Sequence, residues 1–141
     1  KTVMIVDDSI VRGNTSQRIV EMAKEAGAKQ VYFASSAPPI VHPNVYGIDM
    51  PARDEYVAHD RTIDEIREAI GADWLIYQEL PDLVESCLKT GDHNLVNFDC
   101  SCFNGVYVTG GITEEYLARI EGARNDAAKS ESSVEHADAA E

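Results

Sequence analysis

Apolar runs and helical repeats follow one another along the first part of the chain. Val3–Val6 is an unbroken apolar run, which is typical of a strand buried on both faces of a parallel sheet. Ser16–Ala26 carries apolar residues at helical spacing, and Gly27 follows it as a typical helix end. A second apolar run, Val31–Ala34, stops before two prolines. This order predicts a βαβ unit in which Val3–Val6 is a central strand of a parallel sheet.

Strand and helix signals continue after a long loop through residues 43–51. The predicted elements are a helix over Ile63–Ile70 that begins with a capping box at Thr62, a strand over Asp73–Tyr77 with Trp74 in the core, a helix over Pro81–Leu88, a pair of short strands over Leu95–Phe98 and Gly105–Val108, and a helix over Glu114–Arg124. We therefore expect an α/β domain over residues 1–125. Residues 126–141, mostly Ala, Ser, Glu and Asp, are expected to form a disordered acidic tail.

Composition limits the classes of function. The 141 residues suffice for one domain with a core of its own. Lys and Arg number 12 against 25 Asp and Glu, a net charge of −13, so we expect no binding to nucleic acid or to anionic membranes. No apolar run reaches the roughly 18–20 residues of a membrane span. Three cysteines without a disulfide-framework spacing suit a reducing cytosol, and we expect a cytoplasmic protein.

The segment from Val3 to Thr15 carries the candidate chemistry. Asp7 and Asp8 come where the first strand ends, which is the usual ligand position in an open α/β sheet. The loop that follows consists of Ser9, Ile10, Val11, Arg12, Gly13, Asn14 and Thr15, and it leads into a helix. A helix N-terminus offers unpaired N–H groups to phosphate, and carboxylates accept hydrogen bonds from sugar hydroxyls or bind Mg²⁺. The segment predicts a phosphosugar site, with phosphate on the loop and the ribose diol and Mg²⁺ on the two acids.

Two other interpretations of this segment have to be weighed. In one, the acid pair merely ends a strand and the loop is a plain turn, but that reading does not explain the glycine-containing entry into a helix. In the other, the chain is a phospho-acceptor receiver domain, which also begins with an acid pair after an apolar strand. Receivers need a second buried strand ending in an acid near Asp49 and a late lysine ending a strand. The segment before Asp49 is rich in turn residues, and Lys89 and Lys129 do not end predicted strands, so the receiver interpretation fails.

Residues Val3–Thr15 resemble the motif with which type I phosphoribosyltransferases bind phosphoribosyl pyrophosphate (PRPP). Three further segments, Pro43–Pro51, Ile70–Asp73 and Phe103–Thr109, look like those of the glutamine PRPP amidotransferases, or amidophosphoribosyltransferases. The similarity runs from residue 1 to about residue 126. It implies the incomplete parallel-sheet core of a type I phosphoribosyltransferase. The chain has no initiator Met and starts in a strand, so we expect the true N-terminus to lie upstream.

The resemblance implies an enzyme that transfers ammonia from glutamine to PRPP. The product is 5-phosphoribosylamine, in the first committed step of purine biosynthesis. In such an enzyme Asp7 and Asp8 bind the ribose hydroxyls and Mg²⁺, and Ser9–Thr15 bind the 5′-phosphate. A glutaminase domain precedes this chain, purine nucleotides act as feedback inhibitors, and the full enzyme is expected to be a homo-oligomer. The isolated chain is expected to be inactive. Alternatives are a non-catalytic phosphosugar- or nucleotide-binding module and another PRPP-dependent phosphoribosyltransferase.

Some members of this family bind an iron–sulfur cluster. Their cysteine ligands lie in segments that match Pro43–Asp49 and Asp99–Phe103. In this chain Asn44 and Asp99 occupy two of those positions, which leaves Cys102 alone. The resemblance therefore implies a member without an iron–sulfur cluster, and the thiols are expected to be buried as small apolar groups.

Overall fold

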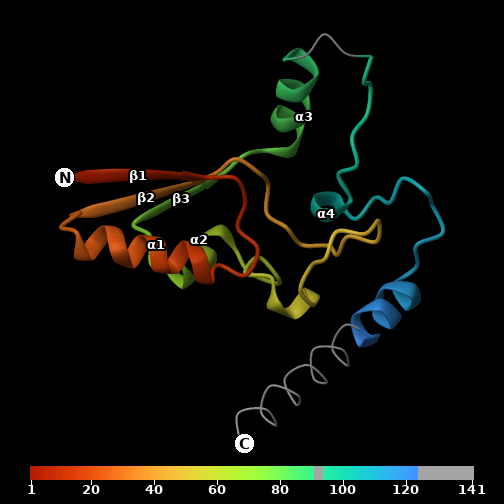
Figure 1. Cartoon of the computed structure of the whole chain (residues 1–141), viewed down its shortest axis with the longest axis horizontal. Coiled ribbons are helices and arrows are strands. Elements are labelled where there is room, and N and C mark those ends of the chain that lie inside the picture. Colours follow the sequence, from red (N-terminus) through yellow and green to blue (C-terminus); the bar gives the residue numbers. More distant parts are fainter. Residues whose placement is uncertain (91–93, 124–141) are drawn as a thin grey trace, which may run out of the picture.

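The computed structural model describes residues 1–90 and 94–123 (Figure 1). Its elements are β1 (Thr2–Asp7), α1 (Asn14–Glu25), β2 (Gln30–Ser35), the 3-10 helix η1 (Arg53–Glu55), α2 (Ile63–Ala69), β3 (Trp74–Tyr77), α3 (Leu80–Lys89) and α4 (Ser101–Asn104). Residues 114–123 are helical as well, as the sequence predicts. The predicted acidic tail, 126–141, lies outside the described residues.

The three strands form one parallel sheet in the order β1-β2-β3. The predicted βαβ unit is confirmed, because α1 connects β1 to its parallel neighbour β2. The second crossover contains α2, which begins with the predicted capping box at Thr62. Figure 1 shows α1 and α2 together on one side of the strands.

The core lies between the sheet and these two helices. β2 is its centre, because Val31 and Phe33 are both fully buried. The other core residues come from the loop after β1, from α1, from the segment before α2, from α2 and its end, and from β3. They are Ile10, Val20, Val57, Ala58, Ile66, Ile70, Ala72, Leu75 and Tyr77. The sheet face turned toward the helices is therefore well packed.

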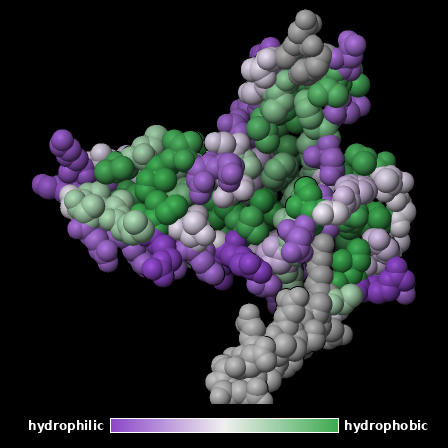
Figure 2. Space-filling model, in the orientation of Figure 1, coloured by the Kyte–Doolittle hydropathy of each residue, from purple (hydrophilic) through white to green (hydrophobic). Residues whose placement is uncertain are grey.

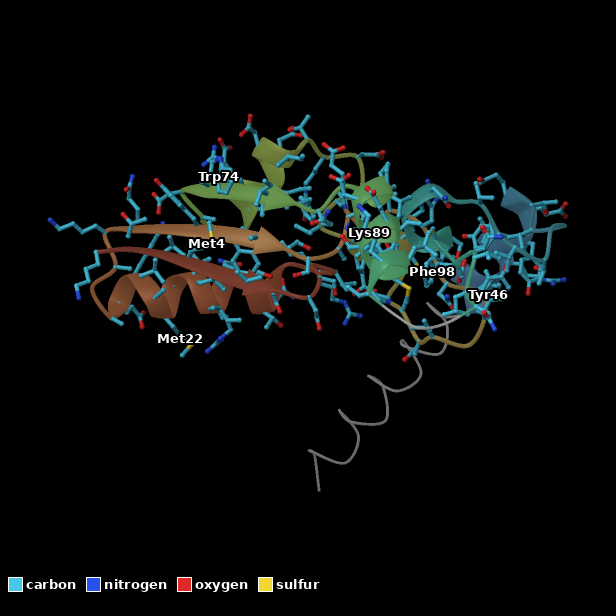
Figure 3. All side chains as sticks on the ribbon, turned by 90° about the horizontal axis from the view of Figure 1, so that it is seen from above. Met4, Met22, Tyr46, Trp74, Lys89 and Phe98 are labelled. Atoms are coloured by element: carbon cyan, nitrogen blue, oxygen red, sulfur yellow. The ribbon has the colours of Figure 1, made fainter. Side chains whose placement is uncertain are left out.

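The prediction that Val3–Val6 is a buried central strand is wrong. β1 is at the edge of the sheet, and Met4 and Val6 are 56% and 67% exposed. Trp74, expected in the core, is 42% exposed on the same bare face, in register with Met4 through β2 (Figure 3). Figure 2 shows the apolar surface that results over the strands. Among the strands of the described residues, β2 is the central one, because it pairs with β1 on one side and with β3 on the other.

The predicted strand pair is also wrong. Neither 95–98 nor 105–108 is a strand, and Ser101–Asn104 between them forms the short helix α4. Gly105, with φ 70°, ends α4 in the left-handed conformation instead of closing a hairpin. Residues 42–49 contain no strand, in line with the rejection of a receiver domain. No helix within the described ranges is long and apolar enough to span a membrane.

Candidate functional site

An open cleft of about 530 Å³ lies where β1 ends and α1 begins. Its lining residues are Asp7, Asp8, Ser9, Val11, Arg12, Gly13, Asn14, Thr15 and Ser16. The fold thus brings eight of the nine predicted site residues together. The exception is Ile10, which is 1% exposed and belongs to the core. Ser16 was missed because a small polar residue inside a predicted helix gives no signal of a site.

The two carboxylates are partly engaged with the loop itself. The backbone N–H of Asp8 donates to Oδ1 of Asp7 at 3.0 Å, and the Ser9 hydroxyl donates to Oδ1 of Asp8 at 3.1 Å. The backbone carbonyl of Asp7 also accepts a hydrogen bond from the N–H of Ser36, at 2.9 Å. These bonds fix the chain at the end of β1. They also leave the Oδ2 atom of each acid without a hydrogen-bond partner in the described part of the chain.

This donor set fits Mg²⁺ only if a ligand completes the coordination. Mg²⁺ prefers oxygen ligands and commonly combines one or two carboxylates with water and substrate phosphates. Within residues 1–90 and 94–123, no group of three or more His, Cys, Asp or Glu side chains could hold a metal ion. Asp7 and Asp8 can therefore supply part of a coordination sphere, and a phosphate-bearing ligand would have to supply more.

The N-terminus of α1 is open toward the cleft. Gly13 is its N-cap, with φ 80°, and no side chain caps the helix. The carbonyl of Gly13 accepts from the N–H of Gln17 at 2.8 Å, which closes the first turn. The N–H groups of Asn14, Thr15 and Ser16 precede that turn and have no intrahelical acceptor. An anion in the cleft would meet these donors and the positive end of the helix dipole.

The back of the loop packs against the segment that follows Ala52. The N–H of Val57 donates to the carbonyl of Val11 at 2.8 Å, and Nε of Arg12 donates to Oε2 of Glu55 at 2.8 Å. A Cβ atom at Gly13 would lie 3.0 Å from Cγ2 of Val57, in the core and not in the cleft. The glycine is therefore needed to pack the loop, a role that the sequence motif did not reveal.

The segments compared above with iron–sulfur proteins lie next to each other, since the N–H groups of Val41 and His42 both donate to the carbonyl of Cys102. Asn44 is 2% exposed, and its Oδ1 accepts from the N–H groups of Tyr46 and Ile48. Sγ of Cys102 lies 3.8 Å from Sδ of Met50, and burial raises the pKa of this thiol. Within the described residues, no group of three or more His, Cys, Asp or Glu side chains gathers here.

The prediction that all thiols are buried is wrong. Cys87 is exposed on α3, a helix that projects from the end of the sheet (Figure 1). Cys100 and Cys102 are half-buried. Helical spacing places Leu83, Val84 and Cys87 on one side of α3, but the helix buries none of its residues in the described structure.

Comparisons with known proteins agree with the resemblance. No protein-family model matches the chain. The amidophosphoribosyltransferase of Pseudomonas aeruginosa is 56% identical over 132 residues, which are 94% of this chain and 26% of that protein. The Escherichia coli enzyme of the same name is 56% identical over 129 residues, 92% of this chain and 25% of that protein. The chain thus spans about a quarter of the length of the curated relatives that it matches.

Two solved structures match the fold. One is the glutamine PRPP amidotransferase of Bacillus subtilis in complex with ADP and GMP, with a TM-score of 0.67 and 43% identity over 76% of this chain and 24% of that one. The other is described as the allosteric regulatory enzyme of purine biosynthesis, with a TM-score of 0.69 and 41% identity over 86% of this chain and 26% of that one. The expected fold, a parallel-sheet part of a type I phosphoribosyltransferase, is confirmed. The chain is therefore related, along nearly its whole length, to a segment that makes up about a quarter of an amidophosphoribosyltransferase.

Proposed function

We propose that the full-length protein containing this chain transfers ammonia, released from glutamine, to PRPP and forms 5-phosphoribosylamine. The observation that carries this proposal is the cleft at the end of β1, which gathers the acid pair, the loop and an uncapped helix N-terminus. The relatedness to amidophosphoribosyltransferases supports the choice of ammonia as the acceptor. The cleft itself is equally suited to any PRPP-dependent transfer.

The loop residues Ser9–Thr15 receive the 5′-phosphate in this proposal. The N–H groups at the start of α1 and the Thr15 hydroxyl donate to the phosphate oxygens, and charge-assisted bonds of this kind contribute roughly 1.5–3 kcal/mol each. The Ser9 hydroxyl, which donates to Asp8 in this structure, would leave that bond to donate to the phosphate. Ile10 has no contact with the ligand, because it is part of the core. Its burial anchors the loop, and this is how it serves the site.

Asp7 and Asp8 face the sugar end of the ligand. Their Oδ2 atoms accept hydrogen bonds from the ribose hydroxyls or coordinate Mg²⁺. Asp7 and Asp8 would hold Mg²⁺ together with PRPP, and the ion would supply positive charge to offset that of the leaving pyrophosphate. Ammonia is a nucleophile without deprotonation, so the chain's own residues act by holding the sugar and its phosphate in place.

The test is Asp7→Asn combined with Asp8→Asn in the full-length protein. We expect PRPP binding and ammonia-dependent formation of phosphoribosylamine to be lost, while glutamine hydrolysis stays measurable, because that chemistry lies outside this chain. The control is Glu21→Gln with Glu25→Gln, which removes the same charge from the exposed side of α1. Near-normal kcat/KM for PRPP in the Asp7, Asp8 variant would show that the acids are wrongly assigned.

Further features of the family are proposed for the full-length protein. We expect a cytoplasmic homo-oligomer with a glutaminase domain, feedback inhibition by purine nucleotides and no iron–sulfur cluster. This chain alone is expected to bind AMP weakly through the cleft and to make no phosphoribosylamine. Calorimetric titration with AMP, size-exclusion chromatography and an iron and sulfide assay of the purified full-length protein test these expectations.

A further inference from the structure

The candidate loop depends on a segment that is distant in sequence. Residues 52–57, here called the buttress, contain η1 and lie against the back of the loop. The Val57 N–H bonds to the carbonyl of Val11 at 2.8 Å, and the Val57 side chain fills the space beside Gly13. The buttress therefore shapes the backbone from which the phosphate-binding N–H groups project, although none of its residues lines the cleft.

Glu55 is the buttress residue whose charge reaches the loop. Its Oε2 accepts the hydrogen bond from Nε of Arg12 at 2.8 Å. Its Oε1 accepts from the backbone N–H of Ala52 at 3.2 Å, at the start of η1. Both oxygens of the carboxylate are thus occupied, one by the buttress itself and one by the loop. A carboxylate fixed in this way can hold a guanidinium in one orientation.

Arg12 lies between the candidate cleft and a second cavity. It lines the candidate cleft, and with Glu55 it also lines a smaller cavity of about 260 Å³ behind the loop. Within the described residues, the bond from Nε to Glu55 is the one hydrogen bond of its guanidinium. The donors on Nη1 and Nη2 are therefore left for a ligand, and Arg is well suited to binding phosphate oxygens with such donors.

We propose that Glu55 is a positioning residue of the phosphosugar site, which acts by holding the Arg12 guanidinium at the edge of the cleft. The inference rests on the proposed function, because it needs the cleft to bind an anionic sugar phosphate. Glu55 does not touch the ligand. Its negative charge opposes the binding of an anion nearby, and it favours binding only by orienting Arg12.

These two effects of Glu55 change the affinity for PRPP in opposite directions, and the direction of the change can be measured. If Glu55 acted only as a charge near the site, removing it would favour binding of the anionic PRPP. If it acts as a positioning residue, removing it weakens binding, because Arg12 loses its orientation. Asp54 is the matched control: it carries the same charge on the same 3-10 helix, is exposed and lines the same small cavity, but within the described residues Arg12 forms its ion pair with Glu55 and not with Asp54.

The experiment measures the KM for PRPP, the kcat with free ammonia, and the Kd for PRPP with Mg²⁺ in the full-length protein. The variants are Glu55→Gln, Asp54→Asn, Arg12→Ala and the Arg12→Ala, Glu55→Gln double variant. We expect Glu55→Gln to raise the KM and the Kd up to about fivefold, which is the upper limit for one exposed ion pair, with kcat changed less than about twofold. Asp54→Asn should leave the Kd unchanged or lower it.

The double variant separates action through Arg12 from an independent effect. If Glu55 acts through Arg12, Glu55→Gln has no further effect on the Kd once Arg12 is Ala. A Kd that is unchanged or lowered by Glu55→Gln overturns the proposal, as does an equal rise in the Arg12→Ala background. A wild-type protein that does not bind PRPP at all would instead refute the proposed function. Thermal unfolding of each variant shows whether the fold is retained.

Discussion

Gly13 is the residue whose replacement tests the packing of the candidate loop most directly. It is the N-cap of α1, with φ 80°. A Cβ atom there would lie 3.0 Å from Cγ2 and 3.3 Å from Cβ of Val57, and 3.4 Å from Cγ2 of Ile70. Both neighbours belong to the core and cannot swing into solvent. Gly13→Ala therefore combines a strained backbone with a collision.

The two effects can be given magnitudes. A non-glycine residue in the left-handed region costs about 1–2 kcal/mol. Forcing one methyl group into a packed core costs typically about 1–3 kcal/mol. We expect Gly13→Ala to lower the free energy of unfolding by about 2–5 kcal/mol, a large share of the roughly 5–15 kcal/mol of an ordinary domain. Gly27→Ala is the control, since Gly27 has φ 95° but no atom within 4 Å of its Cβ position.

Urea unfolding of this chain, followed by circular dichroism, measures the difference between the two variants. Gly27→Ala should show the backbone cost alone, about 1–2 kcal/mol. Val57→Ala should cost less in the Gly13→Ala background than in the wild type, because the shortened side chain removes the collision. Equal destabilisation by Gly13→Ala and Gly27→Ala would refute the reasoning, since it would mean that the core does not resist a side chain at Gly13.

Three further predictions concern the fold and the thiols. The backbone N–H and the hydroxyl of Thr62 lower the pKa of Glu65 below its ordinary 4.5, so the deficit of Glu65→Ala in urea midpoint should be present at pH 7 and should close as the pH falls through the lowered pKa. Val31→Ala in the core should cost about 2 kcal/mol or more in urea unfolding, whereas Val6→Ala on the bare face should cost under about 1 kcal/mol, and equal costs would contradict the burial pattern. Iodoacetamide should alkylate the exposed Cys87 before the other two thiols, as peptide mass spectrometry would detect.

The regular elements of the first 90 residues could be predicted because their signals are local. The capping box at Thr62 and the left-handed glycines at 27 and 71 mark helix ends in the sequence and in the structure alike. The parallel order of β1 and β2 followed from the helix between them. The failed strand pair shows the limit of such signals, because Asn104-Gly105 suits a helix end as well as a hairpin turn.

The exposure of β1 could not be predicted, because an apolar run in the sequence does not show whether another element packs against it. Met4 and Val6 are apolar yet more than half exposed, on a sheet face that no described helix covers. Val31 and Phe33 on β2 look no different in sequence and are fully buried. Burial in the described structure therefore depends on which elements pack against each strand, and not on the strand's own sequence.

The sequence predicted most of the residues that line the candidate site but not the residues that support its loop. Asp7, Asp8 and the residues at the start of α1 stand next to one another in the chain, and a strand end followed by a helix entry brings them to one cleft. The support for the loop comes from Glu55 and Val57, which lie 43 and 46 positions beyond the loop residues that they contact and which the motif does not contain. Glu55, for instance, lies 43 residues beyond Arg12 and bonds to it directly.

The buttress is itself held in place by the last described helix. The backbone N–H of Arg53 in the buttress donates to Oε1 of Glu121 at 2.9 Å, and its guanidinium lies 3.9 Å from Glu114. Both acids are in the helical residues 114–123. The last described helix is thereby joined, through the buttress, to the loop that begins at residue 9. A motif of thirteen residues therefore specifies which groups face the ligand, but the geometry of those groups depends on residues that are distant in the sequence, at 53–57 and 114–121.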